Sequence, residues 1–162
     1  MQNAKDSFYL ALRSRLAVVN PERTVLLRGT LRPGIILEEA EASFAQPPAD
    51  AFILRWLGLG ADLQTPSTMV AMECEFCYCT SGTQAFGGLD RGRSLSRMDR
   101  ELLAMLQPLS TPKFNYSVQP AAQLQTKVFW DEPVFSPITA QRDRLSRTVR
   151  AMVYSYEEQS ER

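Results

Sequence analysis

The sequence predicts an α+β domain with a mostly antiparallel sheet and two main helices packed on one face. Two stretches, residues 3–19 and 94–107, repeat apolar residues at helical spacing. Several strand-like stretches follow one another with no helical pattern between them, which favours hairpin pairing. The 162 residues suffice for one domain, so we expect a single domain over 1–157 and a fraying polar C-terminal tail over 158–162.

The two predicted helices have recognisable boundaries. The first begins where Asn3 can cap it and ends before Pro21, because the residue preceding a proline avoids the helical conformation. The second begins at Ser94 as its cap and is stopped by Pro108. Each has one apolar stripe that we expect to be buried. The stripes are Phe8, Leu12, Leu16 and Val19 in the first helix, and Leu95, Met98, Leu102, Met105 and Leu106 in the second.

Apolar stretches outside the helices predict the strands. They cover residues 23–32, 35–37, 51–63, 69–80, 126–140 and 143–158, the last two as an antiparallel pair. Residues 51–63 are apolar at both alternating sets of positions, which predicts a central strand with both faces covered. We expect loops or irregular structure at residues 40–50, 81–93 and 109–125.

The composition argues against several classes of function. The chain contains no histidine, which excludes a Ser-His-Asp triad, a Cys-His pair and histidine-ligated zinc within it. Its 18 basic and 18 acidic side chains balance, which argues against bulk electrostatic attraction to nucleic acid or anionic lipid. The start of the sequence lacks the apolar run of a signal peptide, and no stretch reaches the ~20 apolar residues of a spanning helix. We therefore expect no membrane partner and a reducing compartment at synthesis.

All three cysteines lie in the short stretch Cys74–Cys79, CEFCYC, whose Cys-x-x-Cys pair and third cysteine are similar to part of a metal-binding motif. In a strand, alternate side chains point to opposite faces, so Cys74 points away from Cys77 and Cys79. A zinc site needs four ligands, and the chain has no histidine and no fourth cysteine. We therefore expect cysteines packed in a strand, with no metal and no cofactor. A redox role remains the alternative.

The carboxylates beside these cysteines allow two interpretations. Glu73 and Glu75 share the strand face opposite Cys74, where paired carboxylates are able to serve acid–base chemistry. The same pattern is typical of a polar sheet face, or of a face covered by a partner chain. We expect the second interpretation, and the question becomes what covers the two carboxylates.

Three charged stretches are candidates for interaction surfaces. Residues 38–44, EEAEASF, lack the pattern of a calcium loop and predict either a solvated loop or a partner contact. Residues 89–97, LDRGRSLSR, place three arginines near a helix start, where a phosphate is able to bind. Residues 142–150, RDRLSRTVR, predict a solvated sheet edge, or a surface for an acidic protein or passing DNA. The candidate contacts are Glu38, Glu39, Glu41, Phe44, Arg91, Arg93, Arg97, Arg147 and Arg150.

The order of elements and two short strings resemble the tail-terminator (minor tail) proteins of long-tailed phages. The string RPGIILEEAE, residues 32–41, is similar to that family's Arg-Pro-apolar stretch leading into an acidic loop. The string TVRAMVYSYE, residues 148–157, is similar to its last strand, where Val153, Tyr156 and Glu157 match an apolar-x-x-Tyr-Glu ending. The resemblance covers most of residues 4–157. Residues 81–93 and 108–126 are longer than the family's compact connections.

This resemblance implies a structural protein with no chemistry and no cofactor. Its members form a hexameric ring that caps the tail tube and meets a head-side connector protein, while DNA passes through the lumen without sequence-specific binding. The expected location is a virion or phage-tail-like particle, with the host cytoplasm before assembly. On this interpretation, Arg91, Arg93 and Arg97 line the lumen or meet the acidic loop of the next subunit, in which case Glu39→Arg compensates for Arg93→Glu.

Two other functions remain open at this point. One is a small-ligand-binding α+β domain without catalysis, with an apolar pocket lined by residues such as Trp56, Phe76 and Tyr78. The other is an enzyme that uses carboxylates and arginines. The absence of histidine and of a recognisable catalytic motif makes us expect a protein that is not an enzyme.

Overall fold

The computed structural model describes the whole chain except residues 42–46, 63–67, 84, 159–160 and 162. Its helices are α1 (Gln2–Val19), α2 (Glu38–Glu41) and α3 (Leu89–Met105), with the short 3-10 segment η1 (Ala85–Gly88) before α3. Its strands are β1 (Thr24–Leu27), β2 (Thr30–Pro33), β3 (Ile35–Leu37), β4 (Phe52–Asp62), β5 (Met69–Thr80), β6 (Ser110–Asn115), β7 (Ala122–Trp130), β8 (Val134–Phe135), β9 (Thr139–Gln141) and β10 (Arg144–Tyr156).

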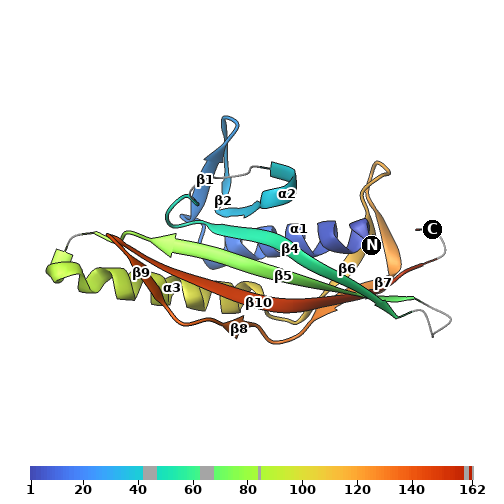
Figure 1. Cartoon of the computed structure of the whole chain (residues 1–162). Coiled ribbons are helices and arrows are strands. Elements are labelled where there is room, and N and C mark those ends of the chain that lie inside the picture. The colour runs from blue at the N-terminus through green and yellow to red at the C-terminus, as the bar shows by residue number, and fades with distance from the viewer. Residues whose placement is uncertain (42–46, 63–67, 84, 159–160, 162) are drawn as a thin grey trace.

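The main sheet has the order β3-β4-β5-β10-β7-β6, and β8 and β9 also pair with β10. Every pairing in it is antiparallel except that of β3 with β4. Figure 1 shows β10 running along the sheet, and β1 and β2 forming a separate hairpin that stands away from it. The predicted α+β fold with a mostly antiparallel sheet is confirmed.

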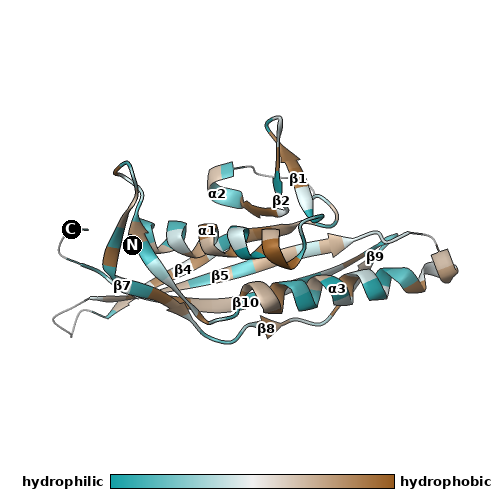
Figure 2. Cartoon of the chain, turned by 180° about the vertical axis from the view of Figure 1, so that it is seen from behind, coloured by the Kyte–Doolittle hydropathy of each residue, from teal (hydrophilic) through white to brown (hydrophobic). Residues whose placement is uncertain are grey.

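Both main helices cover the same face of the sheet (Figure 2). Phe8 of α1 lies at the centre of the core, with its ring centroid 4.9 Å from that of Trp130 and 5.7 Å from that of Trp56. The stripe of α3 is buried as predicted, as are three of the four predicted positions in α1. Val19, the last residue of α1, is the exception at 40% exposed.

The alternation predicted for residues 69–80 is confirmed. Each of Val70, Met72, Cys74, Phe76 and Tyr78 is buried beneath the helices. Glu73, Glu75 and Cys77 point to the other face, which we call the open face. In the described part of the chain, no three His, Cys, Asp or Glu side chains are placed to hold a metal ion.

Two predicted strands differ from the structure. Residues 23–32 are not one strand but the hairpin β1–β2, whose turn residues Arg28 and Gly29 have φ of +48° and +79°. Positive φ at both positions is the geometry of a tight two-residue hairpin turn. The predicted central strand, residues 51–63, is buried only at its start. There Phe52 to Leu54 pair with β3, which extends no further along the strand. Leu57 and Leu59 beyond it are 43% and 55% exposed.

Both predicted helix caps are wrong. Asn3 is already a residue of α1, and its side chain donates a hydrogen bond to Glu161 at 3.2 Å instead of capping the helix. Helix α3 begins at Leu89, five residues before Ser94, whose hydroxyl lies 3.0 Å from that of Thr80. The residue before α3 is Gly88 at φ +88°, so a left-handed glycine stands where a side-chain cap was expected.

The expected irregular segment 109–125 is also wrong, since it contains β6 and the start of β7. Pro112 hides β6 in the sequence, because proline lacks the N–H that a central strand requires and is found at sheet edges. β6 is the edge strand beside β7, and α1 lies along it: the N–H of Phe114 donates to the Ser7 hydroxyl at 2.9 Å. None of the described helices is both long enough and apolar enough to cross a membrane.

Candidate interaction surfaces

The acidic segment α2 is mostly occupied within the chain. The Glu41 carboxylate accepts hydrogen bonds from both terminal nitrogens of Arg32, from the Tyr9 hydroxyl at 2.7 Å and from the Leu37 N–H at 2.9 Å. Burial alone would raise the pKa of Glu41, but these bonds outweigh it and hold the pKa below its usual value. The contact of Glu41 with another subunit stays a prediction, and within this chain its carboxylate already has partners in Arg32, Tyr9 and Leu37.

The other acidic candidates of α2 differ in how closely they are paired with basic side chains. Glu38 forms an ion pair with Arg55 at 2.9 Å, whereas Glu39 is half exposed and lies 3.9 Å from Lys5. Phe44, the remaining candidate in this stretch, lies outside the described residues. Of the described acidic candidates, Glu39 has the carboxylate that is most exposed and least closely paired.

A row of alternating charges crosses the open face and answers what covers Glu73 and Glu75. Arg150 of β10 lies 3.1 Å from Glu75 and 3.5 Å from Glu73, and Arg55 of β4 lies 3.8 Å from Glu75 on the other side. The carboxylates are thus neutralised by arginines of the adjacent strands. This arrangement fits a polar sheet face, and it occupies the carboxylates that acid–base chemistry would need.

The arginines of β10 do not share one surface. Arg147 points under the helices, where it bonds Asp99 of α3 at 2.6 Å, while Arg150 points to the open face and is 60% exposed. Strand alternation separates residues three apart in this way. These two arginines therefore lie on opposite faces of β10, and the partner contacts expected of them stay predictions.

The arginines of α3 differ in the side chains that they contact. Arg97 lies 3.2 Å from Glu101, and the Arg93 guanidinium lies 5.7 Å from the Phe86 ring centre. Arg91 lies beside Gly82, where its side chain would touch an added Cβ at 2.8 Å. Within the described chain, Arg93 and Arg100 have no acidic partner.

Among the exposed large apolar side chains are three groups, and others, such as Val18, Leu57 and Leu59, lie outside them. The first, which we call the basic end, consists of Phe86 of η1 and of Leu89, Arg93 and Arg100, which lie four and seven residues apart along α3. Phe86 is 74% and Leu89 68% exposed, and Phe86 is held in a left-handed conformation at φ +53°. A non-glycine residue in this region costs about 1–2 kcal/mol. The basic end borders a hollow of about 510 Å³ floored by Gly92 and Ser96.

The second group, the aromatic face, lies on the open face where β7 meets β10. It consists of Phe129, Val134, Tyr154 and Tyr156. The acidic residues Asp131 and Glu132 lie between Phe129 and Val134 in the sequence. Phe129 stacks on Tyr154 at a centroid distance of 5.4 Å, and Val134 is 72% exposed. Asp131 accepts a hydrogen bond from the Tyr154 hydroxyl at 2.7 Å. Neither acid has a basic partner among the described residues.

The third group is the β1–β2 hairpin. Leu26 and Leu31 face each other across its two strands, and each is 66% exposed. A two-stranded hairpin on its own is marginally stable in water. The two leucines of this hairpin nevertheless stay largely exposed. The sequence contained signals for it in Arg28-Gly29 and the flanking leucines, but none showed which side the leucines would face.

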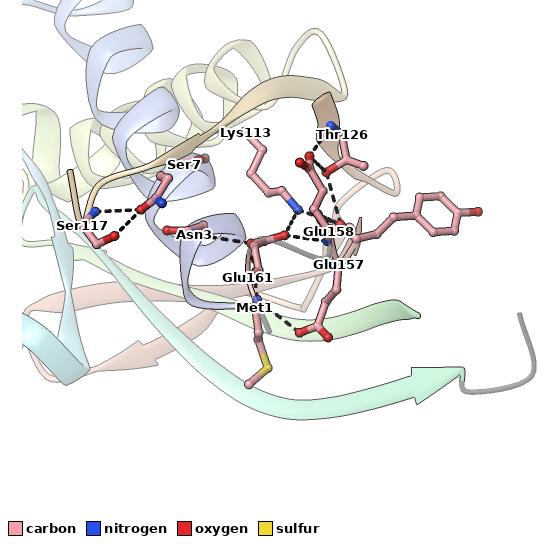
Figure 3. A network of polar contacts seen from close by, with 12 residues as sticks. Met1, Asn3, Ser7, Lys113, Ser117, Thr126, Glu157, Glu158 and Glu161 are labelled. Atoms are coloured by element: carbon pink, nitrogen blue, oxygen red, sulfur yellow. Dashed lines mark hydrogen bonds and ion pairs between the residues drawn. The ribbon is translucent and has the colours of Figure 1, made fainter. Parts of the chain in front are cut away.

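The two chain ends are joined by a polar network (Figure 3). Lys113 of β6 is 1% exposed and donates to Glu161 and to the Tyr156 carbonyl, both at 2.6 Å. The amine of Met1 lies 3.3 Å from Glu157 and 3.7 Å from Glu161. Within the polar tail expected over 158–162, the side chain of Glu161 is 2% exposed. No sequence pattern announced this pair, because its members lie 48 residues apart.

Two further hollows have many polar residues in their lining. One of about 470 Å³ is lined by residues that include Arg23, Asp50 and Arg97, and another of about 820 Å³ by residues that include Tyr78, Arg144 and Arg147. Of the three aromatic residues predicted to line an apolar pocket, only Tyr78 borders one of these described hollows, since Phe76 is fully buried in the core and Trp56 packs against that core beside Phe8.

We expect the cysteine thiols to react slowly in the folded protein. Burial raises the pKa of Cys74 and that of Cys77 to about 12 each, and raises the pKa of Cys79, so little thiolate exists at pH 8. A disulfide reagent should label the native protein at least about tenfold more slowly than the urea-unfolded chain, which should show three thiols. A native thiol that reacts at the unfolded rate would contradict this packing.

Comparison of the chain with protein-family models gives no match, and neither does comparison with curated proteins.

Proposed function

We propose that this protein is a structural assembly subunit, a tail-terminator-like ring subunit that caps the tail tube of a phage or phage-tail-like particle. One observation supports the proposal: large apolar side chains are exposed on several separate parts of the molecule, among them the basic end, the aromatic face and the β1–β2 hairpin. Contiguous exposed apolar groups mark protein contacts, and a subunit inside a particle must contact several neighbours at once.

The polar groups support the same proposal. The carboxylates on the open face are neutralised by Arg55 and Arg150, and the arginine Arg147 is held by Asp99. Charges fixed in this way stabilise a surface but leave no pair of groups poised for proton transfer. The protein then acts by binding: two surfaces join copies into a hexameric ring around the DNA path, and the others meet the tail-tube and head-side connector proteins.

The test is electron microscopy of tail tubes assembled with and without the protein. We expect rings of this protein at the tube ends, and tubes of uncontrolled length when it is omitted, because a bound ring blocks further addition. The matched control is the tube protein with an unrelated protein of similar mass. Tubes of equal length in both samples, with bare ends, would overturn the proposal.

A further inference from the structure

We propose that the basic end of one copy binds the aromatic face of the next copy, and that this head-to-tail contact builds the ring. The inference rests on the proposed function and names the two surfaces that it requires. The surfaces differ from each other, so the contact is heterologous, and a heterologous contact generates a ring when its rotation closes.

The positions of the two surfaces fit a head-to-tail contact. Figure 1 shows the start of α3 at one end of the elongated molecule, and β7 with the last part of β10 toward the other end. The basic end belongs to the helix layer, whereas the aromatic face belongs to the open side of the sheet. One copy therefore cannot join its own two surfaces, and a second copy can reach each of them.

The charges of the two surfaces are complementary. Arg93 and Arg100 at the basic end lack acidic partners in the described chain, and the nearby Asp90 is occupied by the N–H and hydroxyl of Thr83. On the aromatic face, Asp131 and Glu132 lack basic partners in the same described residues. Among the basic residues of the neighbouring strands, Lys127 precedes Asp131 by four residues, and Arg150 is held by Glu73 and Glu75. Each surface therefore has an excess of one sign, and opposite signs favour encounter and fix the register.

The apolar groups are matched as well. Phe86 and Leu89 project from the basic end at 74% and 68% exposure, and the stacked pair Phe129 and Tyr154 offers a flat aromatic surface. Aromatic anchors that become buried dominate the energy of interfaces, while flanking charges mainly steer. The left-handed conformation of Phe86 holds the ring outward, at φ +53°. A residue kept in a costly conformation and left exposed is consistent with a ligand-facing role.

Glu39 is a weaker partner for Arg93. Its neighbours Glu38 and Glu41 are held by Arg55 and Arg32, so the α2 segment offers a single carboxylate, which already lies 3.9 Å from Lys5. The aromatic face offers two unpaired carboxylates next to exposed rings. The two possibilities make different predictions for charge exchange, and this difference decides the experiment.

The experiment uses four full-length variants and measures self-association by native mass spectrometry and light scattering. Arg93→Glu and Glu132→Arg should each weaken self-association at least about tenfold, because each sets like charges against each other. The double variant, Arg93→Glu with Glu132→Arg on one chain, should recover the ring. Arg142→Glu, which reverses an exposed arginine outside both surfaces, is the matched control and should assemble like the wild type.

Mixing the two single variants gives the sharpest result. The native basic end of the Glu132→Arg chain fits the native aromatic face of the Arg93→Glu chain. The arginine introduced at position 132 likewise fits the glutamate introduced at position 93, so every contact in an alternating assembly is matched. We expect closed rings of alternating variants from the mixture, although neither variant assembles well alone. Rescue of Arg93→Glu by Glu39→Arg in place of Glu132→Arg would overturn the proposal, as would wild-type assembly of both single variants.

The outcomes separate this inference from the proposed function. A wild-type protein that is monomeric alone but forms rings on tail tubes, and whose single variants also form them, overturns the inference and leaves the function standing. Alternating assemblies from the mixture, without any ring of the wild-type protein on a tube, overturn the function and leave the contact standing. A Phe86→Ala variant that folds normally and still associates like the wild type would also overturn the inference.

Discussion

Glu161→Gln is expected to destabilise the protein by about 3–5 kcal/mol, the cost of leaving a buried charge without its partner. Lys113 is 1% exposed and Glu161 2% exposed, and their atoms are 2.6 Å apart. The glutamine keeps the volume of the side chain but removes the charge that neutralises the Lys113 amine. Urea unfolding at pH 7, followed by tryptophan fluorescence, measures the change.

Glu157→Gln is the control for this prediction, because Glu157 pairs with the Met1 amine at a more exposed site, 3.3 Å away. We expect a loss below about 1 kcal/mol for an exposed pair. The double variant Lys113→Met with Glu161→Leu should recover most of the lost stability, since a buried pair is often replaceable by apolar residues. Equal stability of Glu161→Gln and the wild type would show that the C-terminal segment is not held in place.

The pH dependence gives a second measurement of the same contact. Burial alone would raise the pKa of Glu161, but the hydrogen bond from Lys113 and its partners outweigh it and lower the pKa. A lowered folded pKa contributes stability that is complete above the unfolded value of about 4.3 and is lost as the pH falls through the folded pKa. The wild type should therefore lose more stability than Glu161→Gln between about pH 5 and pH 3.

Glu41→Gln is expected to cost about 3 kcal/mol, the low end of the range for breaking a buried ion pair. The carboxylate is the common acceptor for Arg32 and Tyr9, and the Arg32 side chain is 8% exposed. Without the negative charge, the Arg32 guanidinium remains in a poorly solvated site between β2 and α1. Burial first, and then the bond to Glu41, raise the pKa of Tyr9, so this tyrosine stays neutral in both proteins.

The matched control here is Glu39→Gln, two residues away, with a half-exposed carboxylate 3.9 Å from Lys5. We expect a change below about 1 kcal/mol. Thermal unfolding of both variants at pH 7 separates the two sites. Similar midpoints for Glu41→Gln and Glu39→Gln would mean that Glu41 is free for a partner, as its acidic stretch first indicated.

The fold was largely readable from the sequence where a pattern repeats within one element. The stripes of α1 and α3 and the alternation of β5 follow from 3.6-residue and two-residue periods, which depend on neighbours along the chain. The errors fall where one residue type serves two purposes. Asn3 and Ser94 are good caps by composition, yet Asn3 bonds Glu161 and Ser94 pairs with Thr80. Pro112 argued against a strand, but β6 is an edge strand.

The candidate surfaces were less predictable than the fold. Clusters of charge were visible in the sequence, but a cluster does not show which charges are already paired. Glu41 and Arg147 were candidates for contact with other chains and are bound to Arg32 and Asp99. The exposed aromatic residues Phe86 and Phe129 were not candidates, because an aromatic residue in a sequence usually indicates core.

By itself the sequence determined the class of fold, the buried faces of α1, α3 and β5, and the absence of histidine chemistry. These follow from local periodicity and from composition, which need no knowledge of distant neighbours. Only the tertiary structure decided which charges meet, as Lys113 and Glu161 do, and which apolar residues stay outside, as Phe86 and Val134 do. The physical reason is that burial and pairing across 48 residues depend on how the elements pack, and packing brings together residues that no local pattern relates.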